Sequence, residues 1–319
     1  MKKLLQYILP EDDRTRKFTA VGITILIAGL LTIWGIYGIG EYGIFLFILV
    51  PLFIGAGPVI LYGLKKKITK TNSLLIGLFT LAIFTAGLLA FAIEGIICVV
   101  MAAPFGLLLT WAGSSIGYAV IQKRPDNAPL TFLLLILIIP VMAFIERNDQ
   151  PDLTSVVTSI EINADPQTVW KNVIEFPQLD EPTELIFKTG IAYPVNAEIV
   201  GTGVGAVRHC NFTTGSFIEP VTVWDEPRLL KFDVDEQPEP LKELSFWDID
   251  APHLHDYFVS KQGQFKLTQL PNGNTLLEGT TWYYHNIRPA FYWQFWSSNI
   301  IHKIHERVLT HIKKNSENR

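Results

Sequence analysis

Two charged residues, Arg208 and Glu219, occupy positions where the sequence pattern predicts apolar side chains. Residues 201–235 predict three consecutive antiparallel strands, with turns at Thr214-Gly215 and at residues 225–228. Alternation along these strands predicts one shared face, made of Arg208, Cys210, Phe212, Phe217, Glu219, Val221, Val223, Leu230, Phe232 and Val234. Pairing outward from the turns places Phe212 opposite Phe217, Cys210 opposite Glu219, Arg208 opposite Val221, Val223 opposite Leu230 and Val221 opposite Phe232. An apolar face with one arginine and one glutamate is the strongest functional signal in the chain.

A second hairpin is predicted around Asn272-Gly273, and it extends the same interior. Its expected pairs are Leu267 with Glu278, Phe265 with Thr280 and Gly263 with Trp282, which turns Glu278, Thr280, Trp282 and Tyr284 inward. A charge taken out of water costs several kcal/mol unless it is paired, so Arg208 is expected to pair with Glu219, Glu278 or both. Two interpretations stay open: a polar anchor for a ligand, or a structural ion pair. The predicted ligand-binding set is Arg208, Glu219, Glu278, Phe232, Trp282 and Tyr284.

Other polar residues give weaker signals. The run His253-x-His255-Asp256 lacks the third and fourth ligands at fixed spacing that a zinc site needs, so no metal and no cofactor is predicted. His302, His305 and Glu306 share one face of a predicted helix, which favours a solvated or packed helix face. Cys210 has no histidine on its own face to act as a base, so no activated nucleophile is predicted.

The composition of the chain changes near residue 150. Residues 1–151 hold 12 Lys+Arg and 8 Asp+Glu between long apolar runs, whereas residues 152–319 hold 14 and 22, a net charge of −8. An acidic domain without a basic stripe argues against nucleic acid and against anionic headgroups as its partners. The expected boundaries are a cytoplasmic lead-in (1–17), a transmembrane region (18–145), a tether (146–153), a soluble domain (154–314) and a tail (315–319).

The transmembrane region is predicted to contain five spans. These apolar segments are Phe18–Gly38, Ile44–Leu64, Ser73–Ile93, Gly95–Ile121 and Pro129–Ile145. Small residues at helix-packing spacing, Ala102 with Gly106 and Gly113 with Gly117, predict packing seams. Lys and Arg number 11 on one side of the predicted spans and 1 on the other. This distribution predicts a multi-pass protein of a bacterial cytoplasmic membrane, with its N-terminus inside and its C-terminal domain outside the cytoplasm.

The soluble domain shows a family resemblance. A strand, a helix that opens in Ala-Asp-Pro at residues 164–166 with Val169-Trp170, then GTGVGAVRHC, EPVTVWDEP and a closing helix at about 290–314 resemble the START/Bet v 1-like superfamily, also called SRPBCC or polyketide cyclase/dehydrase and lipid-transport proteins. The resemblance implies an α+β helix-grip fold, a curved antiparallel sheet that wraps a long C-terminal helix around a hydrophobic cavity. Five preceding spans fall outside the common pattern of that superfamily.

Two functions are consistent with this resemblance. The favoured one is a membrane-tethered binding module, not an enzyme, that holds a lipid or other hydrophobic small molecule. The alternative is a cyclase, dehydrase or hydrolase that uses Arg208, Glu219 and Glu278 as acid, base or oxyanion support. Carboxylates locked to Arg208 favour binding or structure, whereas a free carboxylate with a raised pKa favours catalysis.

Overall fold

The computed structural model describes residues 8–147, 151–245, 247, 249 and 251–317. Residues 1–7 of the predicted lead-in, 148–150 of the predicted tether and 318–319 of the predicted tail lie outside the described residues. The chain divides into two compact units near residue 150, although residues 245–252 and 287–289 cluster with the first unit. We call these the membrane unit and the grip domain.

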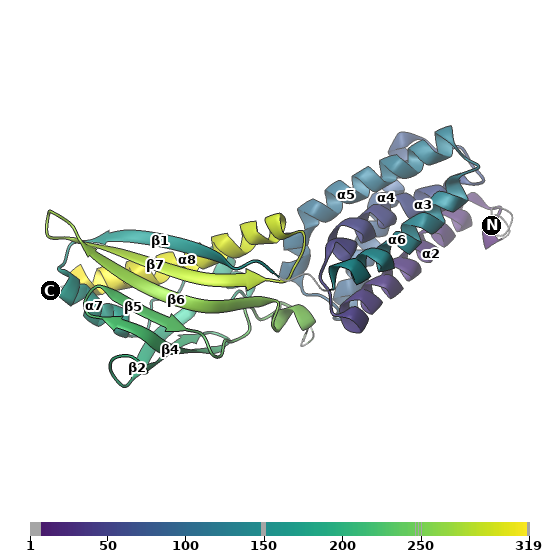
Figure 1. Ribbon diagram of the computed structural model, residues 1–319. Helices are drawn as coiled ribbons and strands as arrows, with labels where there is room; N and C mark the ends of the chain where they lie inside the picture. Colours follow the sequence, from purple (N-terminus) through teal and green to yellow (C-terminus); the bar gives the residue numbers. More distant parts are fainter. Residues whose placement is uncertain (1–7, 148–150, 246, 248, 250, 318–319) are drawn as a thin grey trace. The chain divides into compact units, whose positions relative to one another are not determined.

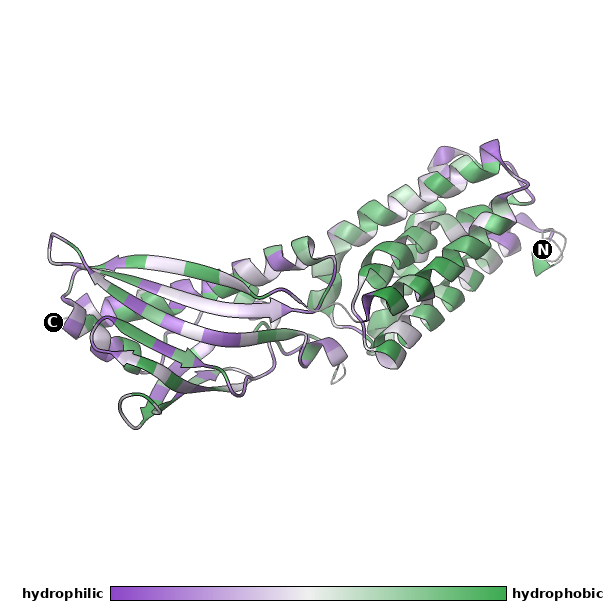
Figure 2. Cartoon of the chain, in the orientation of Figure 1, coloured by the Kyte–Doolittle hydropathy of each residue, from purple (hydrophilic) through white to green (hydrophobic). Residues whose placement is uncertain are grey.

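Within the residues that the structure describes, the membrane unit contains five helices that are long and apolar enough to cross a bilayer, as predicted. Two of the five contain a π-helical stretch, η1 or η2, and Figure 2 shows that apolar residues dominate all of them. The elements are α2 (Asp13–Ile33), η1 (Trp34–Ile39), η2 (Phe45–Leu49), α3 (Val50–Gly63), α4 (Lys70–Ala90), α5 (Ile96–Lys123) and α6 (Ala128–Glu146).

Helices α3 and α5 pack at very short distance through small residues. A Cβ atom added at Gly113 would lie 2.1 Å from the carbonyl oxygen of Leu52, and one added at Gly117 would lie 2.9 Å from the carbonyl oxygen of Ala56. The predicted Gly113–Gly117 seam is therefore confirmed. The prediction for Gly106 is wrong, because nothing lies within 4 Å of a Cβ added there.

The grip domain is a seven-stranded antiparallel sheet curved around one long helix, as Figure 1 shows. The sheet order is β1-β7-β6-β5-β4-β3-β2, and this arrangement is the helix-grip fold expected from the sequence. The strands are β1 (Thr154–Ile162), β2 (Pro194–Val200), β3 (Val207–Phe212), β4 (Gly215–Asp225), β5 (Leu229–Asp233), β6 (Phe258–Gln269) and β7 (Thr275–His285). The helical elements are α7 (Pro166–Ile174), η3 (Leu185–Thr189), η4 (Pro252–Leu254) and α8 (Ala290–Glu317).

Helix α7 begins as its sequence predicts. Asp165 is the N-cap, and its Oδ1 accepts from the backbone N–H groups of Gln167 at 3.0 Å and Thr168 at 3.1 Å. Pro166 is the first helical residue, where a missing N–H costs nothing. The helix buries Val169, Trp170 and Val173 in the core, so its cap fixes how this apolar face enters the domain.

The register between β3 and β4 differs from the prediction by two residues, because the turn is Thr213-Thr214 and not Thr214-Gly215. Arg208 lies opposite Glu219, and Cys210 lies opposite Phe217. A shift of two keeps every side chain on its predicted face. Between β4 and β5 the pair Val221–Phe232 is confirmed, but a bulge follows it, so Leu230 pairs with Trp224 and not with Val223.

The predicted register between β6 and β7 is wrong by one residue. Leu267 pairs with Leu277, Phe265 with Gly279 and Gly263 with Thr281. The cause is a five-residue loop, 270–274, in place of the expected two-residue turn at Asn272-Gly273. An odd shift moves every side chain of β7 to the other face of the sheet.

Helix α8 is held on β1 and β7 by hydroxyl groups and a histidine. The hydroxyl of Tyr283 lies 2.8 Å from Ser297 Oγ on the helix. His305 lies between two threonines, with Nδ1 3.0 Å from Thr158 Oγ1 and Nε2 2.8 Å from Thr281 Oγ1. These contacts satisfy polar groups at a mostly apolar helix–sheet junction.

Candidate functional site

The centre of the candidate site is the ion pair between Arg208 and Glu219, on the inner face of β3 and β4. Only 2% of Arg208 and 6% of Glu219 is exposed. Arg208 Nη1 donates to Glu219 Oε2, which confirms one of the two partners expected from the sequence. Both charged groups are buried, so each is stabilised by the other in place of water.

Three aromatic rings surround the guanidinium of Arg208. Its Cζ lies 5.6 Å from the ring centroid of Phe176, 5.3 Å from that of Phe232 and 5.6 Å from that of Phe265. Such contacts stabilise a cation most where water is excluded. The ring of Phe232 occupies space that only a glycine at 263 leaves open, since a Cβ there would lie 2.4 Å from it. The expected inward position of Phe232 is thus confirmed, with 6% of the residue exposed.

The Nε donor of Arg208 is buried without an acceptor among the described residues. A buried donor without an acceptor costs free energy, so this position favours an acceptor atom supplied from outside the chain.

Burial controls the titration of the groups beside Arg208. It raises the pKa of the Glu219 carboxyl, and the charge of Arg208 opposes this shift. Burial also raises the pKa of the Cys210 thiol to about 12. Since the thiolate is the reactive form, Cys210 is an unreactive thiol at neutral pH.

The structure places Glu278, Trp282 and Tyr284 away from Arg208. They alternate with Leu277 and Tyr283, which are fully buried, so they lie on the outer face of β7. Each of these three side chains contacts a lysine. Lys266 Nζ lies 3.3 Å from Glu278 Oε2, Lys231 Nζ lies 5.2 Å from the ring of Trp282, and Lys261 Nζ lies 5.4 Å from the ring of Tyr284. The expectation that these three residues line the interior with Arg208 is therefore wrong, and its cause is the one-residue register error.

Residues 177–193 run between α7 and the edge strand β2 and contact α8, and we call this segment the strap. Arg307 of α8 donates from Nε to Pro194 O at 3.3 Å and from Nη2 to Asp180 O. Its Cζ also lies 5.2 Å from the ring of Tyr193. A salt bridge of 2.9 Å joins Lys314 of α8 to Asp180. The strap thus joins the helix to the side of the sheet that carries Arg208.

Several apolar side chains of the grip domain remain partly exposed where they pack against the core. They are Ile160, Ile174, Ile199, Phe212, Phe217, Trp224 and Phe265. Phe212 and Phe217 contact each other edge to face, with centroids 4.8 Å apart. Two members of this set, Ile199 and Phe217, pair directly with Arg208 and Cys210. Apolar surface that the chain itself does not cover therefore lies next to the buried ion pair.

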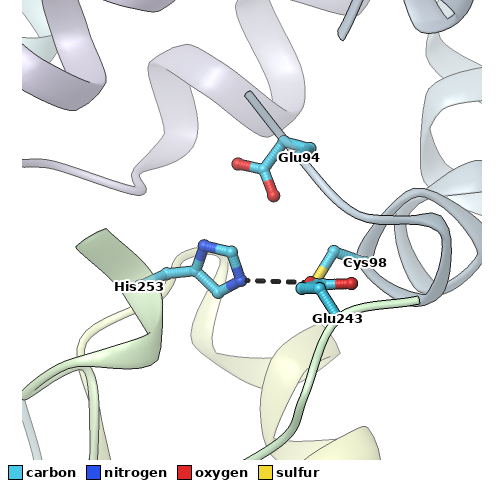
Figure 3. Close-up of side chains that lie close together, drawn as sticks. All are labelled: Glu94, Cys98, Glu243 and His253. Atoms are coloured by element: carbon cyan, nitrogen blue, oxygen red, sulfur yellow. Dashed lines mark ion pairs between the residues drawn. The ribbon is translucent and has the colours of Figure 1, made fainter. Parts of the chain in front are cut away.

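His253, the first residue of the sequence run considered for a metal, lies in η4. Its Nε2 is 3.7 Å from Glu243 Oε1, and Figure 3 shows this pair. Glu94 and Cys98, drawn in the same figure, belong to the membrane unit. The sequence run did not indicate Glu243 as a partner of His253, because ten residues separate them.

Phe176 and Arg307 contact the site or its strap but were not predicted from the sequence. Phe176 follows α7 and is fixed by two backbone hydrogen bonds to Ala197 of β2, at 3.0 and 3.1 Å. The hydrophobic periodicity of the sequence cannot predict such an isolated bridge between two segments. Arg307 lies on the face of α8 toward the strap, and its partners are 113 and 127 residues earlier.

In comparisons with known proteins, solved structures match the C-terminal half of the chain. No family model and no curated sequence matches the chain. A protein of Nitrosospira multiformis is 18% identical, with a TM-score of 0.34, over 52% of this chain and 97% of its own. Truncated norcoclaurine synthase from Thalictrum flavum is 13% identical, with a TM-score of 0.36, over 54% and 98%. The Aha1 dimer from Colwellia psychrerythraea is 14% identical, with a TM-score of 0.32, over 52% and 97%. Similarities this low carry no argument about what this chain binds or catalyses.

Proposed function

We propose that the protein is a membrane-tethered binding module, whose grip domain holds a lipid or another hydrophobic small molecule beside Arg208. The observation that carries this proposal is the unpartnered Nε of the buried Arg208, next to apolar side chains that the chain leaves partly exposed. An apolar body would cover those side chains, and one acceptor atom at its end would accept the Nε hydrogen. The ligand class is therefore an apolar molecule with a carbonyl, hydroxyl or carboxylate oxygen.

Binding is favoured over catalysis by the state of the groups around Arg208. Glu219 is locked to the guanidinium, so it is not a free base. Cys210 is held as a thiol, and Glu278 lies on the outer face beside Lys266. A cyclase, dehydrase or hydrolase of the kind considered above would need at least one of these groups free and inward.

The ligand proposal is tested by identifying the small molecules that co-purify with the protein. The full chain is purified from membranes in a neutral detergent, extracted with organic solvent, and the extract is analysed by mass spectrometry. We expect, in addition to membrane phospholipid, one apolar species in near-equal molar amount to the protein, absent from an unrelated five-span protein purified in parallel. An extract that matches this control would contradict the proposal.

We further propose that the grip domain faces away from the cytoplasm. The support is the 11 to 1 distribution of Lys and Arg between alternating loops. Alkaline phosphatase fused after Arg319 is expected to be active, and green fluorescent protein at the same position is expected to be dark. The opposite pair of results would mean that the domain lies in the cytoplasm, and a fusion after Arg124 controls for the inside orientation.

A further inference from the structure

We infer that the membrane unit binds an anionic phospholipid with a hydroxyl-bearing headgroup in a hollow between α4 and α5. The hollow is partly open and has a volume of about 240 Å³. Its lining residues are Lys70, Thr71, Leu74, Trp111, Ser114 and Ser115. This inference concerns the membrane unit alone and does not rest on the ligand of the grip domain.

The position of the hollow follows from how the two helices pack. Helices α4 and α5 approach closely at Gly77, where an added Cβ would lie 2.1 Å from Ser114 Oγ. The first residue of α4 and the last turn of α5 lie at the same end of the unit, since Gln122 Nε2 donates to Ile68 O at 3.0 Å. The hollow therefore lies beside the crossing and reaches the basic end of the unit, where residues 65–67 and 123–124 are Lys or Arg.

The polar groups of the hollow divide into donors and acceptors. Lys70 has no ion-pair partner within the described part of the chain, whereas Lys65 pairs with Glu11 at 2.5 Å and Lys66 with Asp13 at 2.8 Å. The ammonium of Lys70 and the hydroxyl of Thr71 can donate to phosphate oxygens. The hydroxyl hydrogens of the serines are already used, because Ser115 donates to Trp111 O at 3.0 Å and Ser114 to Gly55 O at 3.4 Å. Their lone pairs can accept from a donor on the ligand such as a headgroup hydroxyl, and Ser115 is the more accessible of the two because only 1% of Ser114 is exposed.

The apolar surroundings match acyl chains. Exposed apolar side chains lie beside the hollow, namely Leu75 on α4 and Leu107, Leu108 and Trp111 on α5. On α5, Leu107 and Leu108 precede Trp111 by four and three residues and so share its face of the helix. Trp111, which is 48% exposed, adds an aromatic ring to this apolar surface. One phosphate, one headgroup hydroxyl and apolar chains together describe a phosphatidylglycerol-like lipid.

The test compares two lysines that differ in one respect. Lys67 and Lys70 are both exposed and carry the same charge, but only Lys70 lines the hollow. The full chain, stripped of lipid in a neutral detergent, is titrated with phosphatidylglycerol and followed by native mass spectrometry. We expect Lys70→Gln to weaken binding about tenfold, the contribution of one hydrogen bond to a charged group. Thr71→Val should weaken binding less, and Lys67→Gln should leave it unchanged.

Three results would overturn the inference. The first is an equal loss for Lys67→Gln and Lys70→Gln, which would indicate charge attraction without a site. The second is equal binding of phosphatidylcholine, because the hollow would then not distinguish an anionic headgroup. The third is inorganic phosphate binding as tightly as the lipid, which would show a phosphate site without a role for the acyl chains. Matching melting temperatures of the variants confirm that the membrane unit remains folded.

Discussion

Replacing Arg208 by Met is expected to lower the free energy of unfolding of the grip domain by about 3 to 5 kcal/mol. Methionine keeps most of the volume among the three phenylalanine rings, but it leaves the Glu219 carboxylate buried without its partner. The measurement is urea unfolding of residues 152–319 expressed alone. We expect this fragment to fold in water, because its two core clusters come entirely from this half of the chain.

The matched control is the double variant Arg208→Met with Glu219→Gln, which removes both charges. Its stability should recover much of the loss, since no stranded charge remains. Lys266→Met is a second control, because it breaks the outer-face pair with Glu278 and should cost less than about 1 kcal/mol. An Arg208→Met variant as stable as the parent would contradict the buried pair.

Acid is expected to destabilise the grip domain through His305, well above the pH at which carboxylates titrate. Burial lowers the pKa of His305 from 6.5 to about 4, and the neighbouring His302 adds to this shift. The unfolded state therefore binds a proton first, so the stabilisation is complete above pH 6.5 and is lost as the pH falls toward 4. The expected loss in free energy of unfolding between pH 7.5 and pH 5 is about 2 kcal/mol.

The geometry around His305 explains why the proton is resisted. Both nitrogens of the buried ring face uncharged threonine hydroxyls, which do not offset the charge of an imidazolium, and Thr158 Oγ1 also lies 2.8 Å from Nδ1 of His302, whose own charge opposes a second one. A His305→Gln fragment should lose stability at pH 7.5 but should show a much flatter pH dependence down to pH 5. His209→Gln, on the opposite face of the sheet from Arg208, controls for the loss of a histidine. An unchanged pH slope in the His305 variant would show that another group causes the acid sensitivity.

The sequence predicted the layout of this protein because its signals are local. Five apolar helices, the N-cap at Asp165 and the closing helix follow from runs and caps within single elements. The pairing of Arg208 with Glu219 was also predictable. The predicted register between β3 and β4 was wrong by two residues, and a shift of an even number leaves both side chains on one face. Because a buried arginine needs a carboxylate, Arg208 was expected to pair with Glu219, Glu278 or both, and the structure shows Glu219.

The inner surface of β7 was not predictable from the sequence, because it depends on how one loop closes. Asn272-Gly273 is typical of a two-residue turn, but Leu270 N donates to Asn274 O at 2.8 Å and closes a five-residue loop. The resulting register shift of one residue places Glu278, Trp282 and Tyr284 on the face opposite to the predicted one. The bulge in β4 likewise moved Trp224 to pair with Leu230, where its ring contacts Trp170 at 5.7 Å. Bulges and loop lengths are set by tertiary packing.

The most direct test of the proposed binding function is whether Arg208 retains a ligand in the grip domain. A protease site is inserted into the predicted tether, and the full chain is purified from membranes. The grip domain is then released by cleavage, and its mass is measured by native mass spectrometry. Release separates this ligand from any lipid held between α4 and α5. We expect the parent domain to carry one small apolar molecule, and the variant Arg208→Met with Glu219→Gln, still folded, to be empty. The proposal that Arg208 anchors a bound ligand would be contradicted by a folded double variant that retains the same ligand mass. It would also be contradicted by a parent domain that carries no ligand mass.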